Sequence, residues 1–120
     1  MYYDPLVLQH FHTPRYGGSL PAAEGVYHCR VGTLATDIIA LYIQINSQHI
    51  IQAARFKAQG CPVTIACASL LTEWLLDKSI TKARTITSQN FITALNLTKE
   101  KMHCALLAED ALHALLMQLS

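Results

Sequence analysis

The sequence predicts an α+β fold, in which a three-stranded antiparallel sheet carries helices on one face. Two observations predict it. Residues 26–59 are rich in β-branched side chains at alternating positions, whereas most of residues 60–119 repeat apolar side chains at helical spacing. Strands that precede the helices, instead of alternating with them, are typical of α+β proteins. Because 120 residues suffice for one core, we expect residues 1–120 to form a single domain.

The first element expected is a short helix over residues 4–12. Pro14 ends this helix, because a proline disfavours the helical conformation in the residue before it. The glycine-rich stretch "RYGGSLP" at 15–21 then reads as a loop. The apolar positions of the helix are Leu6, Val7, Leu8 and Phe11.

Three consecutive strands follow. Residues 26–31 form the first, and "DIIALYIQI" at 37–45 forms the second, with apolar side chains at period two. The turn "NSQ" at 46–48 leads into "HIIQAARFKA" at 49–58, which reads as the returning strand. We therefore expect an antiparallel meander. The positions that share one face of its middle strand are Ile39, Leu41, Ile43 and Ile45.

Helices occupy the rest of the chain. Pro62 suits the first turn of a long helix, where its missing N–H group has no partner to lose. A shorter helical segment is expected over 88–95, and Thr98 is a candidate cap for a final helix. The apolar positions of the long helix are 63, 66, 70, 71, 74 and 75. Those of the final helix are Leu106, Leu107, Leu112, Leu115, Leu116 and Leu119.

Composition and charge exclude several classes of function. The chain is 52% hydrophobic and 14% charged, which excludes a disordered protein. Nine basic against eight acidic residues give no electrostatic reason to bind nucleic acid or a membrane surface. No apolar run reaches the roughly 18 residues of a membrane span, and the first residues lack the pattern of a signal peptide. We expect the mature protein to begin here and to stay in a reducing compartment, the cytoplasm.

The four cysteines differ in their surroundings. Cys61 stands between a glycine and a proline at a predicted helix start, and Cys104 lies within about two turns of Thr98, next to His103. A helix N-terminus lowers the pKa of a thiol, so we expect both to be partly ionised. Cys67 follows Cys61 by six residues, about 600° of helical rotation, so it points elsewhere and is assigned to the core.

Three ordered blocks of the sequence resemble one known family. They are "YDPLVLQHFHTPRYGGSL", then "ARFKAQGC" followed by "IACASLLTEW", and finally "KMHCALLAEDAL". From Tyr3 to about Leu116, the chain resembles the iron–sulfur cluster assembly scaffold family, of the NifU N-terminal or IscU-like type. The α+β fold expected above is the one that this resemblance implies.

The resemblance implies a metal site and a set of partners. The family builds a [2Fe–2S] cluster among three cysteines, a histidine and an aspartate, then passes it to acceptor apo-proteins. Asp37, Cys61, His103 and Cys104 occupy family ligand positions, and Cys104 is by register the acceptor of sulfur. A cysteine desulfurase would supply that sulfur, and an iron donor the iron. The missing family ligand position is Ala35, two residues before the aspartate, where the family has its first cysteine.

Two departures from the family pattern leave alternatives open. Cys29 lies six residues before Ala35, and whether it compensates is not decided by sequence. The segment "LTKEK" at 97–101 lacks the prolines at which a specialised Hsp70-type chaperone docks in the family, which argues against docking by this route. Two sulfurs, one nitrogen and one oxygen suit either a labile cluster or a tetrahedral zinc ion.

Two functional hypotheses follow from this ligand set. The first is a non-enzymatic scaffold or carrier of [2Fe–2S] clusters or iron. The second is a degenerate NifU-like paralogue, a zinc-binding or regulatory interaction protein. A thiol enzyme that uses Cys104 with His103 as base is a weaker alternative, because neighbouring helical residues diverge by about 100°.

The remaining candidate residues are given structural roles. Trp74 is assigned to the core, and Glu109 and Asp110 to the exposed side of the last helix or to hydrogen bonds with nearby backbone. The other histidines are assigned to solvated or capping positions, and they are His10, His12, His28, His49 and His113.

Overall fold

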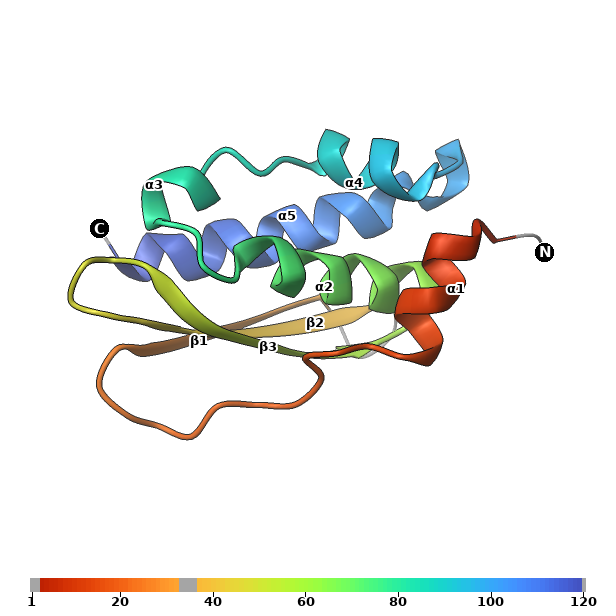
Figure 1. The fold of residues 1–120 in the computed structure, drawn as a ribbon. Helices are drawn as coiled ribbons and strands as arrows, with labels where there is room; N and C mark the ends of the chain where they lie inside the picture. Colours follow the sequence, from red (N-terminus) through yellow and green to blue (C-terminus); the bar gives the residue numbers. More distant parts are fainter. Residues whose placement is uncertain (1–2, 33–36, 120) are drawn as a thin grey trace.

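The computed structural model describes residues 3–32 and 37–119 and confirms the α+β prediction. A single three-stranded antiparallel sheet has the order β1-β2-β3, so consecutive strands are neighbours, as in the predicted meander. The strands are β1 (Val26–Gly32), β2 (Ile38–Ile45) and β3 (Ile51–Gln59). Helices cover one face of this sheet (Figure 1).

Five α-helices accompany the sheet in the described part of the chain. They are α1 (Pro5–His12), α2 (Pro62–Leu75), α3 (Ile80–Ala83), α4 (Ser88–Leu95) and α5 (Met102–Leu116). The 3₁₀ turns η1 (Lys99–Lys101) and η2 (Met117–Leu119) flank α5. The two long helices, α2 and α5, lie on the sheet, while α1 packs beside α2 and α4 packs over α5 (Figure 1). None of the helices described is both long and apolar enough to cross a membrane.

The core forms between the sheet and the two long helices. Successive strand side chains point to opposite faces, so Ile39, Leu41 and Ile43 of β2 share the face below α2 and α5 and are fully buried. On α2, the predicted apolar positions Val63, Ala66, Leu70, Leu71 and Leu75 are buried against it. Trp74 packs against this core with its ring centroid 4.9 Å from that of Phe91, as predicted.

The final helix starts later than predicted. Thr98 precedes the 3₁₀ turn η1, where the Lys101 N–H donates to the Thr98 carbonyl oxygen at 3.0 Å, and the α-helix begins only at Met102. The assignment of Leu106 to the apolar face was also wrong, since it is 51% exposed. Leu106 lies one turn after the exposed Met102, on the side of α5 that faces away from the sheet.

His10 is not the solvated or capping residue that the sequence indicated. It is buried between α1 and α2, where its Nδ1 lies 2.8 Å from Ser69 Oγ and 3.6 Å from Glu73 Oε2. The packing of α1 on α2 removes this ring from water, and the two α2 side chains replace its water partners. The other four histidines named with it are exposed.

Candidate metal centre

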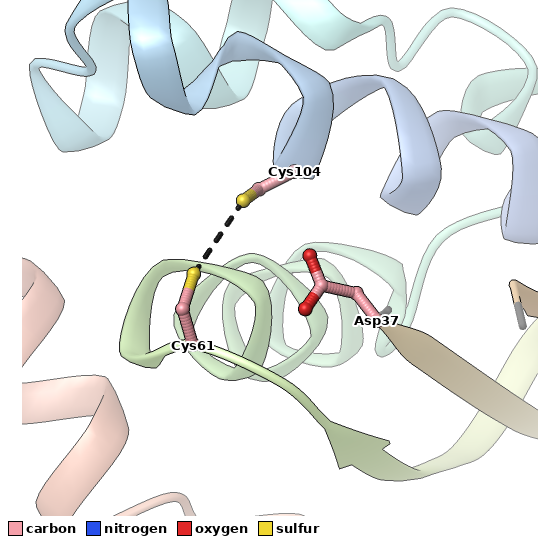
Figure 2. A group of neighbouring side chains, drawn as sticks. All are labelled: Asp37, Cys61 and Cys104. Carbon is pink, nitrogen blue, oxygen red and sulfur yellow. Dashed lines mark hydrogen bonds between the residues drawn. The ribbon is translucent and has the colours of Figure 1, made fainter. Parts of the chain in front are cut away.

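Three side chains that are far apart in sequence converge at one end of the sheet. Ligand atoms of Asp37, Cys61 and Cys104 all lie within 4.8 Å of one another (Figure 2). Asp37 directly precedes β2, Cys61 is the N-cap residue of α2, and Cys104 lies in the first turn of α5. The pairing of Ile38 with Gln59 brings the start of β2 next to the end of β3, so Asp37 comes close to the following helix start.

Gly60 makes room for the carboxylate. Its backbone φ is +142°, a conformation that residues other than glycine rarely adopt. A Cβ added there would lie 2.0 Å from Asp37 Oδ1, so the carboxylate rests against the bare α-carbon. The absence of a side chain at Gly60 therefore leaves space for the Asp37 carboxylate, a contact that sequence reasoning did not identify.

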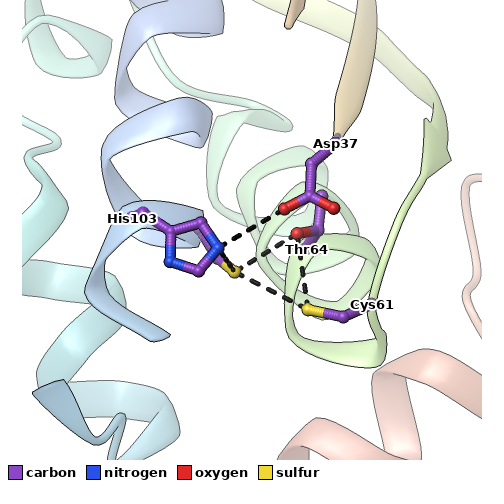
Figure 3. A network of polar contacts seen from close by, with 5 residues as sticks. Asp37, Cys61, Thr64 and His103 are labelled. Carbon is purple, nitrogen blue, oxygen red and sulfur yellow. Dashed lines mark hydrogen bonds and ion pairs between the residues drawn. The ribbon is translucent and has the colours of Figure 1, made fainter. Parts of the chain in front are cut away.

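The two thiols of the site face each other. Cys61 Sγ and Cys104 Sγ are 3.7 Å apart, and the Thr64 hydroxyl donates to Cys104 Sγ at 3.2 Å (Figure 3). Thr64 Oγ1 also lies 3.7 Å from Cys61 Sγ, and the residue is fully buried. Sequence reasoning missed Thr64, although its position three residues after Cys61 on a helix puts the two side chains on one face.

His103 lies at the exposed rim of the site. Its Nε2 is 3.5 Å from Asp37 Oδ2 and 3.5 Å from Cys104 Sγ, and its side chain is 61% exposed (Figure 3). The structure thus brings together all four residues predicted from sequence, three in a tight group and His103 touching two of them. Donor atoms bound to one zinc ion lie within about 4 Å of one another. The group of Asp37, Cys61 and Cys104, within 4.8 Å, comes close to this spacing, and the His103 nitrogen stands outside the group.

Cys29 and Cys67 do not join this group. The Cys29 thiol donates to the Ala111 carbonyl oxygen at 3.0 Å, on α5 seven residues beyond Cys104, or about 10 Å along the helix. The described structure therefore gives no support to compensation by Cys29. Cys67 is fully buried in the core, as predicted. Ala35, the missing ligand position, lies outside the described residues.

Comparison with known proteins identifies the family. The NifU-like N terminal domain matches residues 2–119 of the sequence. The chain belongs to this family. Curated relatives of the NifU-like domain carry the name iron-sulfur cluster assembly scaffold protein IscU. The one from Buchnera aphidicola subsp. Schizaphis graminum is 41% identical over 116 residues, which cover 95% of this chain and 91% of that protein. The one from Escherichia coli strain K12 is 40% identical with the same coverage.

Solved structures share the fold of this NifU-like domain. FiSufU from Fervidobacterium islandicum AW-1 superposes with a TM-score of 0.76 at 17% identity, covering 95% of this chain and 96% of that one. The N-terminal NifU-like protein of Brucella abortus gives 0.69 at 13% identity, covering 96% of this chain and 92% of that one. At these identities the likeness supports the fold alone.

The two thiols of the NifU-like site differ in acidity. Burial alone would raise the pKa of Cys61, but hydrogen bonds from the Thr64 and Val63 N–H groups and from the Thr64 hydroxyl and Cys104 thiol hold it below the ordinary value. Burial raises the pKa of Cys104 to about 12, and nearby charge on Cys61 adds to this, although the Thr64 hydroxyl opposes it. The expectation of a lowered thiol pKa is thus correct for Cys61. It is wrong for Cys104, because the loss of water around the buried thiol outweighs the hydrogen bond from Thr64.

This difference predicts an order of alkylation in the metal-free domain. Cys61 is expected to react first with iodoacetamide, because it is partly exposed and its pKa is lowered. The alkylation rate of Cys61 should rise with pH and reach its plateau at a lower pH than that of an ordinary thiol, because its pKa is lowered. Cys104 should follow, and Cys67, whose pKa burial raises furthest, should react last. Mass spectrometry of tryptic peptides after timed quenching measures each rate. Equal rates at Cys61 and Cys67 would contradict the assignment, and bound zinc should protect both site thiols.

Proposed function

We propose that this protein is an iron–sulfur cluster assembly scaffold or carrier. It transiently binds iron and sulfide as a [2Fe–2S] cluster and passes the cluster to acceptor apo-proteins. The observation that supports this proposal most directly is the convergence of Asp37, Cys61 and Cys104 from three separate elements, with His103 at the rim. The IscU name of relatives about 40% identical to this chain supports it independently.

The chemistry of the donor set suits an iron–sulfur cluster that is bound and later released. Cysteine thiolates bind iron in iron–sulfur clusters, and a histidine replaces a thiolate in some of them. A carboxylate oxygen is a harder donor than a thiolate and holds iron of a cluster less firmly. Because His103 is exposed and Asp37 and Cys61 are partly exposed, the site opens to solvent, where partner proteins could reach it.

The proposed partners follow from this chemistry. A cysteine desulfurase supplies sulfur, an iron donor supplies iron, and apo-proteins in the cytoplasm receive the cluster. The protein itself is not an enzyme. Docking of an Hsp70-type chaperone at residues 97–101 is not proposed, because Lys99–Lys101 close a 3₁₀ turn instead of presenting an extended segment.

Anaerobic reconstitution tests the proposal. The protein is incubated with iron, a cysteine desulfurase and cysteine, and then read by visible absorption and by iron and sulfide analysis. The wild type and Cys29→Ser are expected to take up iron and sulfide, whereas Cys61→Ser and Cys104→Ser are not. Cys29→Ser is the matched control, since Cys29 contacts α5 away from the site. A wild type that takes up no iron or sulfide would contradict the proposal. So would a Cys29→Ser variant whose uptake is lost as completely as that of Cys61→Ser and Cys104→Ser.

A second candidate function is a degenerate paralogue that binds zinc and regulates the desulfurase by interaction. Ala35 in place of a cysteine favours it, as does the position of Cys29 against Ala111. The four remaining donors match the coordination number of zinc. A wild type that binds zinc and the desulfurase but accumulates no iron or sulfide would establish this second function.

Restoring the missing cysteine should prolong the life of a bound cluster. Ala35→Cys adds a third thiolate two residues before Asp37, so we expect the reconstituted variant to lose its visible absorption in air several-fold more slowly than the wild type. The decay of absorption at one protein concentration measures this. Equal decay rates would mean that position 35 does not reach the cluster, and Ala35→Ser controls for the added size.

A further inference from the structure

Thr64 holds a hydroxyl group between the two thiols of the site. Its Oγ1 lies 3.2 Å from Cys104 Sγ, to which it donates, and 3.7 Å from Cys61 Sγ. Among the described residues, the hydrogen-bond partners of this hydroxyl are these two sulfur atoms. The contact with Cys104, to which the hydroxyl donates, is the shorter of the two, and in the contact with Cys61 either atom can be the donor.

A residue that only filled space at position 64 would not need a hydroxyl group. Thr64 is fully buried in the first turn of α2, where a valine of the same shape would fill the volume without a polar atom. Burying a hydroxyl costs free energy unless it is hydrogen-bonded, and here the bond to Cys104 compensates that cost. Because β-branching restricts χ1, the hydroxyl has few directions open to it and acts as a fixed donor.

We infer that Thr64 is a positioning residue of this site. Its hydroxyl aims the Cys104 sulfur at Cys61 and Asp37, and it remains a hydrogen-bond donor to that sulfur when a metal is bound. Groups that hydrogen-bond to metal ligands orient them and tune the bound metal. This inference rests on the proposed function, since it assumes that Cys104 binds metal. It adds a residue that lies outside the predicted ligand set.

Two matched variants separate the hydroxyl from the shape of the side chain. Thr64→Val keeps the shape and removes the donor, whereas Thr64→Ser keeps the donor. Zn²⁺ affinity, measured against a chelator, should fall about 10–100-fold in Thr64→Val and return most of the way in Thr64→Ser. In the Co²⁺-loaded proteins, the sulfur-to-metal charge-transfer band should shift in the valine variant alone. Unchanged affinity and band in Thr64→Val, or no recovery in Thr64→Ser, would overturn the inference.

A metal-free measurement separates this inference from the proposed function. Three-bond NMR couplings across the Cα–Cβ bond of Cys104 report whether its sulfur occupies one rotamer. We expect one rotamer in the wild type and Thr64→Ser, and averaging or a different rotamer in Thr64→Val. Couplings unchanged in Thr64→Val would show that the hydroxyl does not position the sulfur. A wild type that binds neither Zn²⁺ nor Co²⁺ would refute the metal site, while these couplings still decide the role of Thr64. Thermal unfolding checks that both variants fold.

Discussion

Gly60→Ala is expected to lower the Zn²⁺ affinity of the site by about 100-fold while the protein stays folded. The added Cβ would lie 2.0 Å from Asp37 Oδ1 and 2.7 Å from Asp37 Cγ, so the carboxylate must leave its position. The φ of +142° adds backbone strain of about 1–3 kcal/mol to the free energy of folding. Chelator competition measures the affinity, and chemical denaturation measures the free energy of unfolding.

Gly17→Ala is the matched control for this variant. A Cβ at Gly17 meets nothing within 4 Å, so this change should leave metal affinity unaltered. A double-mutant cycle with Asp37→Ala then isolates the clash: Gly60→Ala should destabilise the protein less in that background, because the displaced carboxylate is already absent. Equal destabilisation in both backgrounds would mean that backbone strain, and not the carboxylate, accounts for the cost.

Local patterns predicted the architecture because each one is decided within a few residues. The alternation in β2 defines the face that carries Ile39, Leu41 and Ile43, and the Gly60-Cys61-Pro62 sequence marks where α2 begins. Thr98 misled the prediction, since its side chain makes no capping hydrogen bond and the residues after it form a 3₁₀ turn before α5 begins at Met102.

Features that depend on packing between elements could not be predicted in this way. His10 is buried only because α1 lies on α2. The pKa of Cys104 reflects burial, which a helix-start argument ignores. Thr64 gains its partner only when α5 places Cys104 over the first turn of α2. The family resemblance supplied the ligand set, but the hydroxyl and the glycine that shape the site became visible in three dimensions.

Cys104 is expected to carry a persulfide after incubation with a cysteine desulfurase and cysteine. Because Cys104 is fully buried, we expect the more exposed Cys61, 3.7 Å away, to react first. The Cys61 thiolate attacks the terminal sulfur of the desulfurase persulfide, a new S–S bond forms, and the desulfurase cysteine leaves as a thiolate. The Cys104 sulfur attacks the same terminal sulfur, Cys61 leaves as a thiolate, and the Cys104 proton passes to this departing thiolate, which lies 3.7 Å away.

The direction of this second transfer follows from the acidity of the two thiols. A thiol of lower pKa is the better leaving group, and the pKa of Cys61 is lowered whereas that of Cys104 is raised to about 12. Sulfur should therefore move from Cys61 and accumulate on Cys104, where peptide mass spectrometry detects it. In Cys104→Ser the persulfide should remain on Cys61, and in Cys61→Ser the loading of Cys104 should be several-fold slower. Cys29→Ser controls for the loss of one thiol, because Cys29 contacts α5 away from the site. A desulfurase that binds the protein but leaves no persulfide on either site thiol would rule out the scaffold and favour the regulatory paralogue.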